Sequence, residues 1–187
     1  MMRTIVVVSI LFALALASVA LAFDEPESFR GVPWGASEEQ LRTTLGLTVG
    51  EHSCHEISPE QRWLGDSMCF SLFTLAETNV HAMYEFRADH FVGVLLTFDS
   101  SNFERIAAVF IERYGAPTSE ARPLFQTQGG LTATNQVMNW EGPAIQITLE
   151  RYGNKITEGL GSLWTQDEVR ESMSIYREQT KGAANDL

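Results

Sequence analysis

Residues 101–114 carry apolar side chains at the period of an α-helix, and this pattern constrains the fold more than any other in the chain. Helical spacing places six apolar side chains on one face: Phe103, Ile106, Ala107, Phe110, Ile111 and Tyr114. Ser101 and Glu104 have the spacing of a capping box, and Gly115 and Pro117 mark the end of the helix. A helix with so wide an apolar face has to pack on another apolar surface.

The segment before this helix supplies that surface, because it has the pattern of three antiparallel strands at residues 68–75, 80–87 and 91–98. The middle strand alternates between apolar and polar side chains, as expected of a strand with one face on the core and one toward water. Residues 76–79 and 88–90 are short enough to form hairpin turns. A helix on one face of an antiparallel meander predicts the α+β class.

The same order, a capped helix followed by three strands, occurs twice along the chain. Ser37 and Gln40 form a capping box that starts a helix over residues 37–45, ahead of the first three strands. The second set of strands follows the helix at 101–114 and is predicted at residues 134–140, 144–150 and 156–164.

Together these patterns predict a single α+β domain over residues 23–180. Its halves are residues 37–98 and 101–164, each a helix followed by a three-strand meander. We expect an antiparallel sheet of about six strands, with the helices packed on one face. A further helix is predicted from about 166 to 180, and residues 181–187 form a polar tail.

Residues 1–22 have the pattern of a secretory signal peptide. Arg3 supplies the positive charge, residues 5–20 are apolar, and Ala20-Leu21-Ala22 is a small-x-small cleavage site. An uncleaved membrane anchor is the alternative, although the apolar run is short for a membrane span. Cleavage predicts a periplasmic or secreted chain that begins at Phe23 and has no membrane anchor.

The chain is acidic, with 24 Asp and Glu against 13 Lys and Arg and a formal net charge of −11. A chain of this charge repels nucleic acid and acidic phospholipid, and it contains no run of basic residues that could bind phosphate groups. We therefore expect no nucleic-acid partner. The sequence gives no motif for a cofactor, and we expect none.

Two cysteines, Cys54 and Cys69, are present. An even number in an exported chain predicts a disulfide, which would close a loop over residues 54–69. Two alternatives remain open at this point. His52 and His55 could join the two cysteines as metal ligands, although their spacing fits no established zinc site, or both thiols could be free.

The loop carries Trp63, Leu64 and Asp66. A disulfide would order the loop in advance and lower the entropy lost on binding. A tryptophan on such a loop is a good anchor for a protein partner. The alternative interpretation is that Trp63 folds back as a lid on the core.

A second candidate surface lies in the second predicted meander, around Trp140. Amide side chains at Asn139 and Gln146 are close in the predicted hairpin to Trp140. Amides beside an aromatic ring can bind a sugar or a peptide, although solvation of a polar strand face explains the same residues.

No catalytic residue can be named from the sequence. His81 and His90 fall on a polar strand face and in a turn, and no acid–base partner is indicated for either. Ser37 is explained as a helix cap and lacks the context of a nucleophile elbow. We therefore expect a protein that is not an enzyme. A hydrolase remains the alternative if two carboxylates meet in one cleft.

The segment Phe29-Arg-Gly-Val-Pro-Trp-Gly-Ala-Ser37 and the later Arg113-Tyr-Gly-Ala-Pro117 resemble motifs of uncharacterised small exported bacterial proteins with an N-terminal Phe-x-Gly-x-x-Trp-Gly-x-Ser motif. The helix from Ser37 to Gly46 more loosely resembles the first helix of outer-membrane assembly lipoproteins and β-lactamase-inhibitor-like domains, but the chain lacks the lipid-modified cysteine of the lipoproteins. These resemblances imply an exported helix-and-sheet domain that works by contacting another protein. They carry no active residue onto this chain.

The sequence therefore predicts an exported, non-enzymatic protein-interaction or inhibitor-like module of the bacterial cell envelope. The predicted contact surface is the disulfide-closed loop 54–69, and the partner is another envelope protein. The alternative is a domain that binds a sugar or peptide on the sheet face around Trp140.

Overall fold

The computed structural model describes residues 23–47, 54–127 and 130–183. The predicted signal peptide, His52 and the end of the predicted polar tail lie outside the described residues. None of the helices in the described part of the chain combines the length and the apolar character that crossing a membrane requires.

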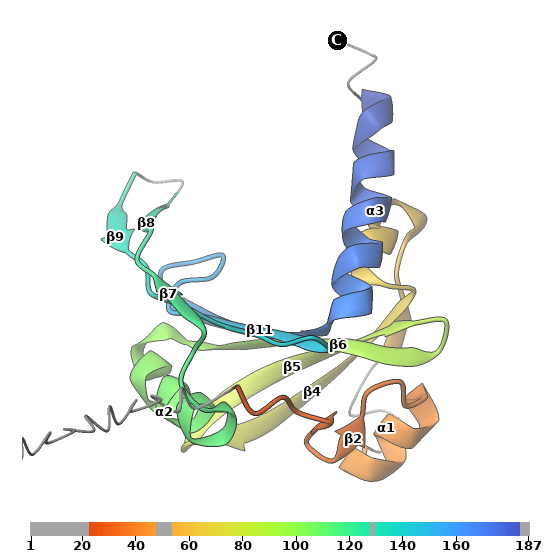
Figure 1. Ribbon diagram of the computed structural model, residues 1–187, viewed down its shortest axis with the longest axis horizontal. Coiled ribbons are helices and arrows are strands. Elements are labelled where there is room, and N and C mark those ends of the chain that lie inside the picture. The colour runs from red at the N-terminus through yellow and green to blue at the C-terminus, as the bar shows by residue number, and fades with distance from the viewer. Residues whose placement is uncertain (1–22, 48–53, 128–129, 184–187) are drawn as a thin grey trace, which may run out of the picture.

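Eight strands form one antiparallel sheet, seen nearly edge-on in Figure 1. In spatial order they are β3 (Cys54–Glu56), β4 (Ser67–Leu75), β5 (Thr78–Arg87), β6 (His90–Asp99), β12 (Glu158–Thr165), β11 (Ile145–Glu150), β10 (Val137–Glu141) and β7 (Ser119–Ala121). Both predicted meanders are present, and they join where β12 pairs with β6.

The predicted number of about six strands is too low. The two further strands, β3 and β7, are edge strands of three residues each. Strands of three residues are too short to show an alternating pattern, so sequence periodicity does not reveal them. Each extends one meander by a strand.

Two tight turns set the register of the first meander. Ala76 and Glu77 both have positive φ, as do Ala88 and Asp89. Two consecutive residues of positive φ form the type I′ turn, whose twist matches that of the strands it connects. The predicted hairpins are therefore confirmed, with two-residue turns that do not use the usual Asn-Gly pair.

Helices α1 (Glu38–Leu45) and α2 (Phe103–Tyr114) lie on one face of the sheet (Figure 1). The capping box of Ser37 and Gln40 is present at α1. The box predicted at Ser101 is not present, because Asp99 accepts a hydrogen bond from the Ser101 amide and starts a 3-10 turn, η2 (Ser100–Asn102), before α2.

The third helix, α3 (Gln166–Ala183), rises from the opposite face of the sheet (Figure 1). The expectation that the helices share one face is therefore wrong for α3. This helix begins directly after β12, and the Thr165 hydroxyl accepts a hydrogen bond from the Glu168 amide at 3.2 Å. Its partners on that face come from η1 (Pro59–Leu64) and from β12.

The core fills the space between the sheet and the helices α1 and α2. Its largest fully buried side chains include Trp140, Tyr84, Phe86, Phe91 and Phe103. A small N-terminal hairpin, β1 (Ser28–Phe29) and β2 (Val32–Pro33), closes this side, and Trp34 stacks on Phe91 with 4.9 Å between the ring centroids.

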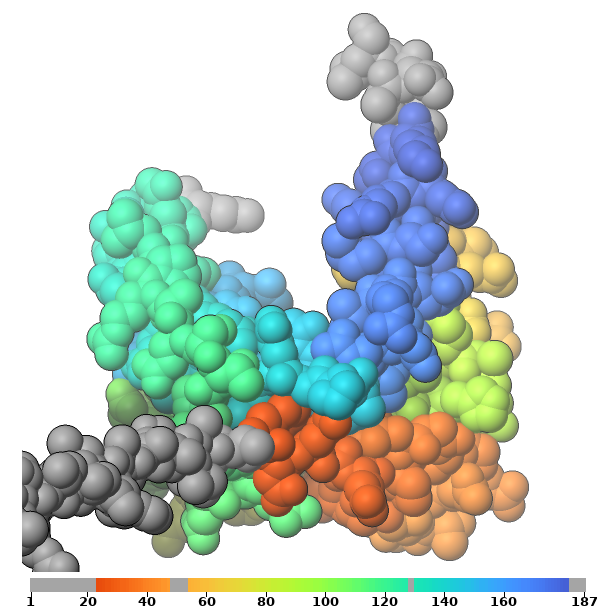
Figure 2. Space-filling view, in the orientation of Figure 1, coloured from red at the N-terminus to blue at the C-terminus, as the bar shows by residue number. Residues whose placement is uncertain are grey.

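The opposite face of the sheet stays open between α3 and a second hairpin, β8 (Leu124–Gln126) and β9 (Thr132–Thr134). Figure 2 shows the resulting hollow between α3 and the segment β7 to β9. We call this hollow the trough.

Candidate functional site

The predicted disulfide is confirmed: Cys54 of β3 and Cys69 of β4 are bonded and face each other in the strand pairing. Both sulfurs are consumed by this bond, so neither serves as a thiolate ligand, and the alternatives of a metal site and of free thiols are wrong. The bond closes the loop that carries η1 and fixes both of its ends to the sheet.

Trp63 lies in η1 with 37% of its surface exposed. Its ring meets Tyr176 of α3 edge to face, with 6.2 Å between the centroids. The residue therefore neither covers the main core nor projects freely, but forms one side of a contact between η1 and α3.

An apolar groove runs between η1 and α3, with a volume of about 380 Å³. Its lining comes from η1, the end of β12 and the first turns of α3: Trp63, Leu64, Trp164, Val169, Ser172, Met173 and Tyr176. Two of the predicted residues, Trp63 and Leu64, therefore meet residues of α3 that are about a hundred positions away in the sequence. We call this site the η1–α3 groove.

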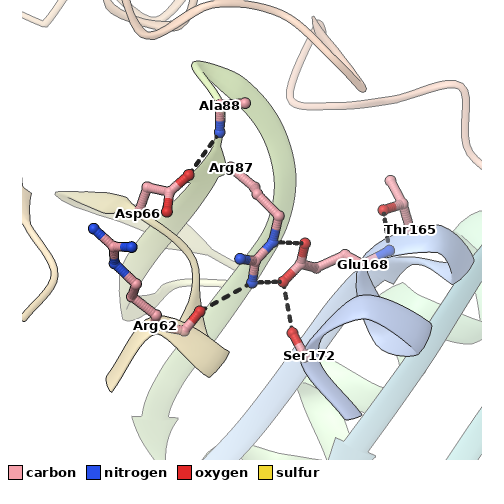
Figure 3. A network of polar contacts seen from close by, with 7 residues as sticks. All are labelled: Arg62, Asp66, Arg87, Ala88, Thr165, Glu168 and Ser172. Atoms are coloured by element: carbon pink, nitrogen blue, oxygen red, sulfur yellow. Dashed lines mark hydrogen bonds and ion pairs between the residues drawn. The ribbon is translucent and has the colours of Figure 1, made fainter. Parts of the chain in front are cut away.

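A largely buried ion pair between β5 and the first turn of α3 fixes the position of that helix (Figure 3). Arg87 of β5 donates from Nε and Nη2 to the two carboxylate oxygens of Glu168, at 2.6 Å each, and Nη2 also donates to the Arg62 carbonyl at 3.2 Å. Ser172 donates its hydroxyl to Glu168 at 2.6 Å. The hydrogen bond to Glu168 raises the pKa of Arg87, so the guanidinium stays charged.

Asp66 does not lie at the mouth of the groove. One of its carboxylate oxygens accepts a hydrogen bond from the Ala88 amide at 2.8 Å (Figure 3). This contact ties the loop to the turn between β5 and β6, so Asp66 positions the loop.

Glu85 is fully buried on the same sheet face as Arg87, and neither of its carboxylate oxygens has a hydrogen-bond partner within the described residues. Burial, with a smaller contribution from the negative charge of Glu168, raises its pKa to about 9. Its neighbour across the strands is Gly93, and the Trp164 ring lies over that glycine. The acid is therefore protonated at neutral pH and lies beside a ring that lines the groove.

The hydrolase alternative requires two carboxylates in one cleft. Glu85 and Glu168 are one close pair of acids, and Asp167, Glu168 and Glu171 line one hollow together with His90. A general acid or base has to reach the atom to which it transfers a proton. Glu85 is fully buried, and Glu168, which is 3% exposed, is neutralised by Arg87. The Glu85–Glu168 pair therefore gives the hydrolase alternative no support, and that alternative stays a prediction.

The residues of the second candidate surface do not come together. Trp140 is fully buried, and its indole Nε1 donates to the Gly115 carbonyl at 2.8 Å. Asn139 and Gln146 point to the other face of the sheet, because neighbouring strand residues and their cross-strand partners alternate between faces. The expectation of a ligand face around Trp140 is therefore wrong, because Trp140 is not on the surface. The alternation that separates it from Asn139 can already be seen in the sequence.

Two exposed apolar side chains lie on this face of the sheet: Phe70 and Leu72 of β4 are 38% and 54% exposed. Strand alternation puts them on the same face as Met68, which lies across β5 and β6 from Trp164. Sequence reasoning missed them as surface residues. The strand at residues 68–75 has apolar side chains on both faces, and this pattern could have indicated an exposed apolar face.

The chain matches no protein-family model, no curated protein and no solved structure.

Proposed function

We propose that this chain is an exported, non-enzymatic protein-interaction or inhibitor-like module of the bacterial cell envelope, and that it contacts its partner through the loop 54–69. The observation that carries the proposal is the η1–α3 groove. Trp63, Met173 and Tyr176 surround this apolar hollow and are between 37% and 50% exposed. Exposed apolar side chains gathered at one place are typical of interaction sites.

Both walls of the groove are held rigidly before any partner arrives. The disulfide fixes the loop that carries η1, and the Arg87–Glu168 ion pair fixes the first turns of α3. Preorganised walls lower the ordering entropy that binding costs. A rigid hollow rimmed by aromatic rings is the kind of pocket that receives a hot-spot side chain.

The proposed occupant is a large apolar side chain on a projecting loop of a partner protein. The partner's surrounding surface is expected to be neutral or basic, because this chain has a net charge of −11 and would repel an acidic surface. Phe70 and Leu72 add exposed apolar side chains on the same face of the sheet, and the concave form of the trough in Figure 2 suits a convex partner.

Site-specific photo-crosslinking in an envelope extract tests this proposal. A benzophenone amino acid is placed at Met173, beside the groove, or at Ile111, which is 40% exposed on α2 across the sheet. We expect a protein adduct from position 173 that is absent from position 111 and that weakens when Trp63→Ala is added. The Cys54→Ser variant should also give less adduct, because the loop loses its disulfide.

Equal crosslinking from both positions, or none from position 173, would rule out the groove as the contact surface. An adduct that survives both Trp63→Ala and Cys54→Ser would remove the loop from the proposal.

A further inference from the structure

A second cavity lies on the other face of the sheet, beneath the N-terminal hairpin, with a volume of about 310 Å³. Its lining comes from the first hairpin, from β4 and β6, and from α2, and it includes Arg30, Phe73, Leu75, Val109, Phe110 and Arg113. Nothing in the proposed protein-binding function uses this cavity. We call it the hairpin–α2 cavity.

The hairpin–α2 cavity has a mainly apolar lining that also includes two arginines. Phe73, Leu75 and Phe110 supply much of its apolar lining, whereas Arg30 and Arg113 are both exposed. A cavity of this size falls at the lower end of the range in which proteins hold small molecules. The combination suits a ligand with an apolar body and one polar end.

Arg30 is held in place, yet most of its hydrogen-bonding capacity is unused. Its guanidinium carbon lies 4.1 Å from the centroid of the Phe73 ring, and Nη1 donates to the Tyr84 hydroxyl at 3.2 Å. A guanidinium carries five N–H donors. No other partner of Arg30 is found within the described residues, so the remaining donors are available to a ligand.

Arg113 is the second cation at this cavity, and it makes no ion pair with any described residue. Arg42, Arg87, Arg105, Arg151 and Arg170 all pair with a carboxylate. Arg62, Arg122 and Arg177 likewise make no ion pair with a described residue, so the distinguishing feature of Arg30 and Arg113 is that both line one apolar cavity.

We infer that the hairpin–α2 cavity binds a small amphipathic anion, namely a monocarboxylate with an apolar tail, whose carboxylate is received by Arg30 and Arg113. The planar fork of a guanidinium matches a carboxylate, and the aromatic and aliphatic lining accepts the tail. Asp24, Glu25 and Glu27 line a neighbouring polar hollow that shares Arg113. These acids would repel a multiply charged anion, which favours a ligand with a single negative charge.

Isothermal titration calorimetry tests the charge requirement with octanoate and octylammonium below their micelle concentrations and with 1-octanol below its solubility limit. We expect octanoate to bind at least tenfold more tightly than the other two. Arg30→Met and Arg113→Met should each weaken octanoate binding about tenfold or more, since each removes a charge-assisted contact. The matched control is Arg105→Met, because Arg105 lies on the same helix as Arg113 and outside the cavity.

A second variant tests the place of binding without removing a charge. Val109→Trp fills the cavity from α2 and should abolish octanoate binding while circular dichroism shows a folded protein. The inference is overturned if octanoate does not bind, if it binds the Arg30→Met and Arg105→Met proteins equally, or if it still binds the folded Val109→Trp protein. Tighter binding of octylammonium at a site blocked by Val109→Trp would overturn it as well.

Discussion

Arg87 and Glu168 form a bidentate ion pair, with both hydrogen bonds at 2.6 Å, that joins the end of β5 to the first turn of α3. The side chain of Glu168 is 2% exposed and that of Arg87 is 18% exposed. The pair therefore acts where water screens it little. It is the polar link that holds one wall of the η1–α3 groove against the sheet.

Removal of one member of this pair should be strongly destabilising. Arg87→Met leaves the Glu168 carboxylate buried without its cation, and the expected loss in the free energy of unfolding is about 3–5 kcal/mol. Urea denaturation measures it. The Arg87→Met/Glu168→Met protein should recover much of that loss, because no uncompensated charge remains. If the loss of unfolding free energy in the double variant equals the sum of the losses in the two single variants, the two residues are not coupled.

Glu85 should make the protein less stable as the pH rises. Its pKa is about 9 in the native state and near 4.5 in the unfolded chain, so the native state holds a proton that the unfolded chain releases between these values. The free energy of unfolding therefore falls as the pH rises from about 4.5 to about 9.

The Glu85→Gln variant keeps the shape of the protonated acid and removes this dependence. At 1.36 kcal/mol per pH unit, it should be more stable than the wild type by about 3 kcal/mol at pH 7, and the difference should vanish near pH 4. Urea denaturation across this pH range measures the difference. A wild-type profile that runs parallel to that of the variant would contradict a buried, protonated acid.

Gly93 provides the space in which the Trp164 ring lies. A Cβ atom at this position would be 2.1 Å from the ring, so Gly93→Ala has to displace the indole from the groove lining. Overpacking of this kind costs about 1–3 kcal/mol. We expect that loss, together with a shift in tryptophan fluorescence.

Gly161→Ala is the matched control for Gly93→Ala. It lies on the neighbouring strand β12, and its added Cβ would meet Leu149 and Leu96 at ordinary contact distances of 3.5 Å. This variant should be tolerated with unchanged fluorescence. Equal effects of the two substitutions would show that the ring does not occupy the space above Gly93.

Loss of the disulfide should lower stability and loosen β3. Cys54→Ala/Cys69→Ala opens a loop with a sequence separation of 15, and the expected cost is about 3 kcal/mol. Urea denaturation should show a similar loss when the wild type is reduced, and reductant should leave the double variant unchanged. In the double variant, amide hydrogen exchange should accelerate most at residues 54–56, relative to the wild type. Unchanged protection of β3 would contradict the prediction that the disulfide holds this strand.

The local features were predictable because short-range physics encodes them. Ser37 and Gln40 cap a helix through contacts three residues apart, and alternation within residues 80–87 indicates a half-buried strand. The disulfide followed from the number of cysteines. The prediction of a shared surface for Asn139 and Trp140 was wrong because neighbours in a strand point to opposite faces of the sheet.

The sequence by itself determined the two helix-then-meander units, the turns between their strands and the sulfur bridge, because each depends on residues close in the chain or on the pairing of two cysteines. Only the tertiary structure decided that β6 pairs with β12, that α3 leaves the other helices for the opposite face, and that Trp63 meets Tyr176. These arrangements depend on contacts between distant segments, whose pairing no local period specifies. The two proposed sites, the η1–α3 groove and the hairpin–α2 cavity, are both products of such contacts.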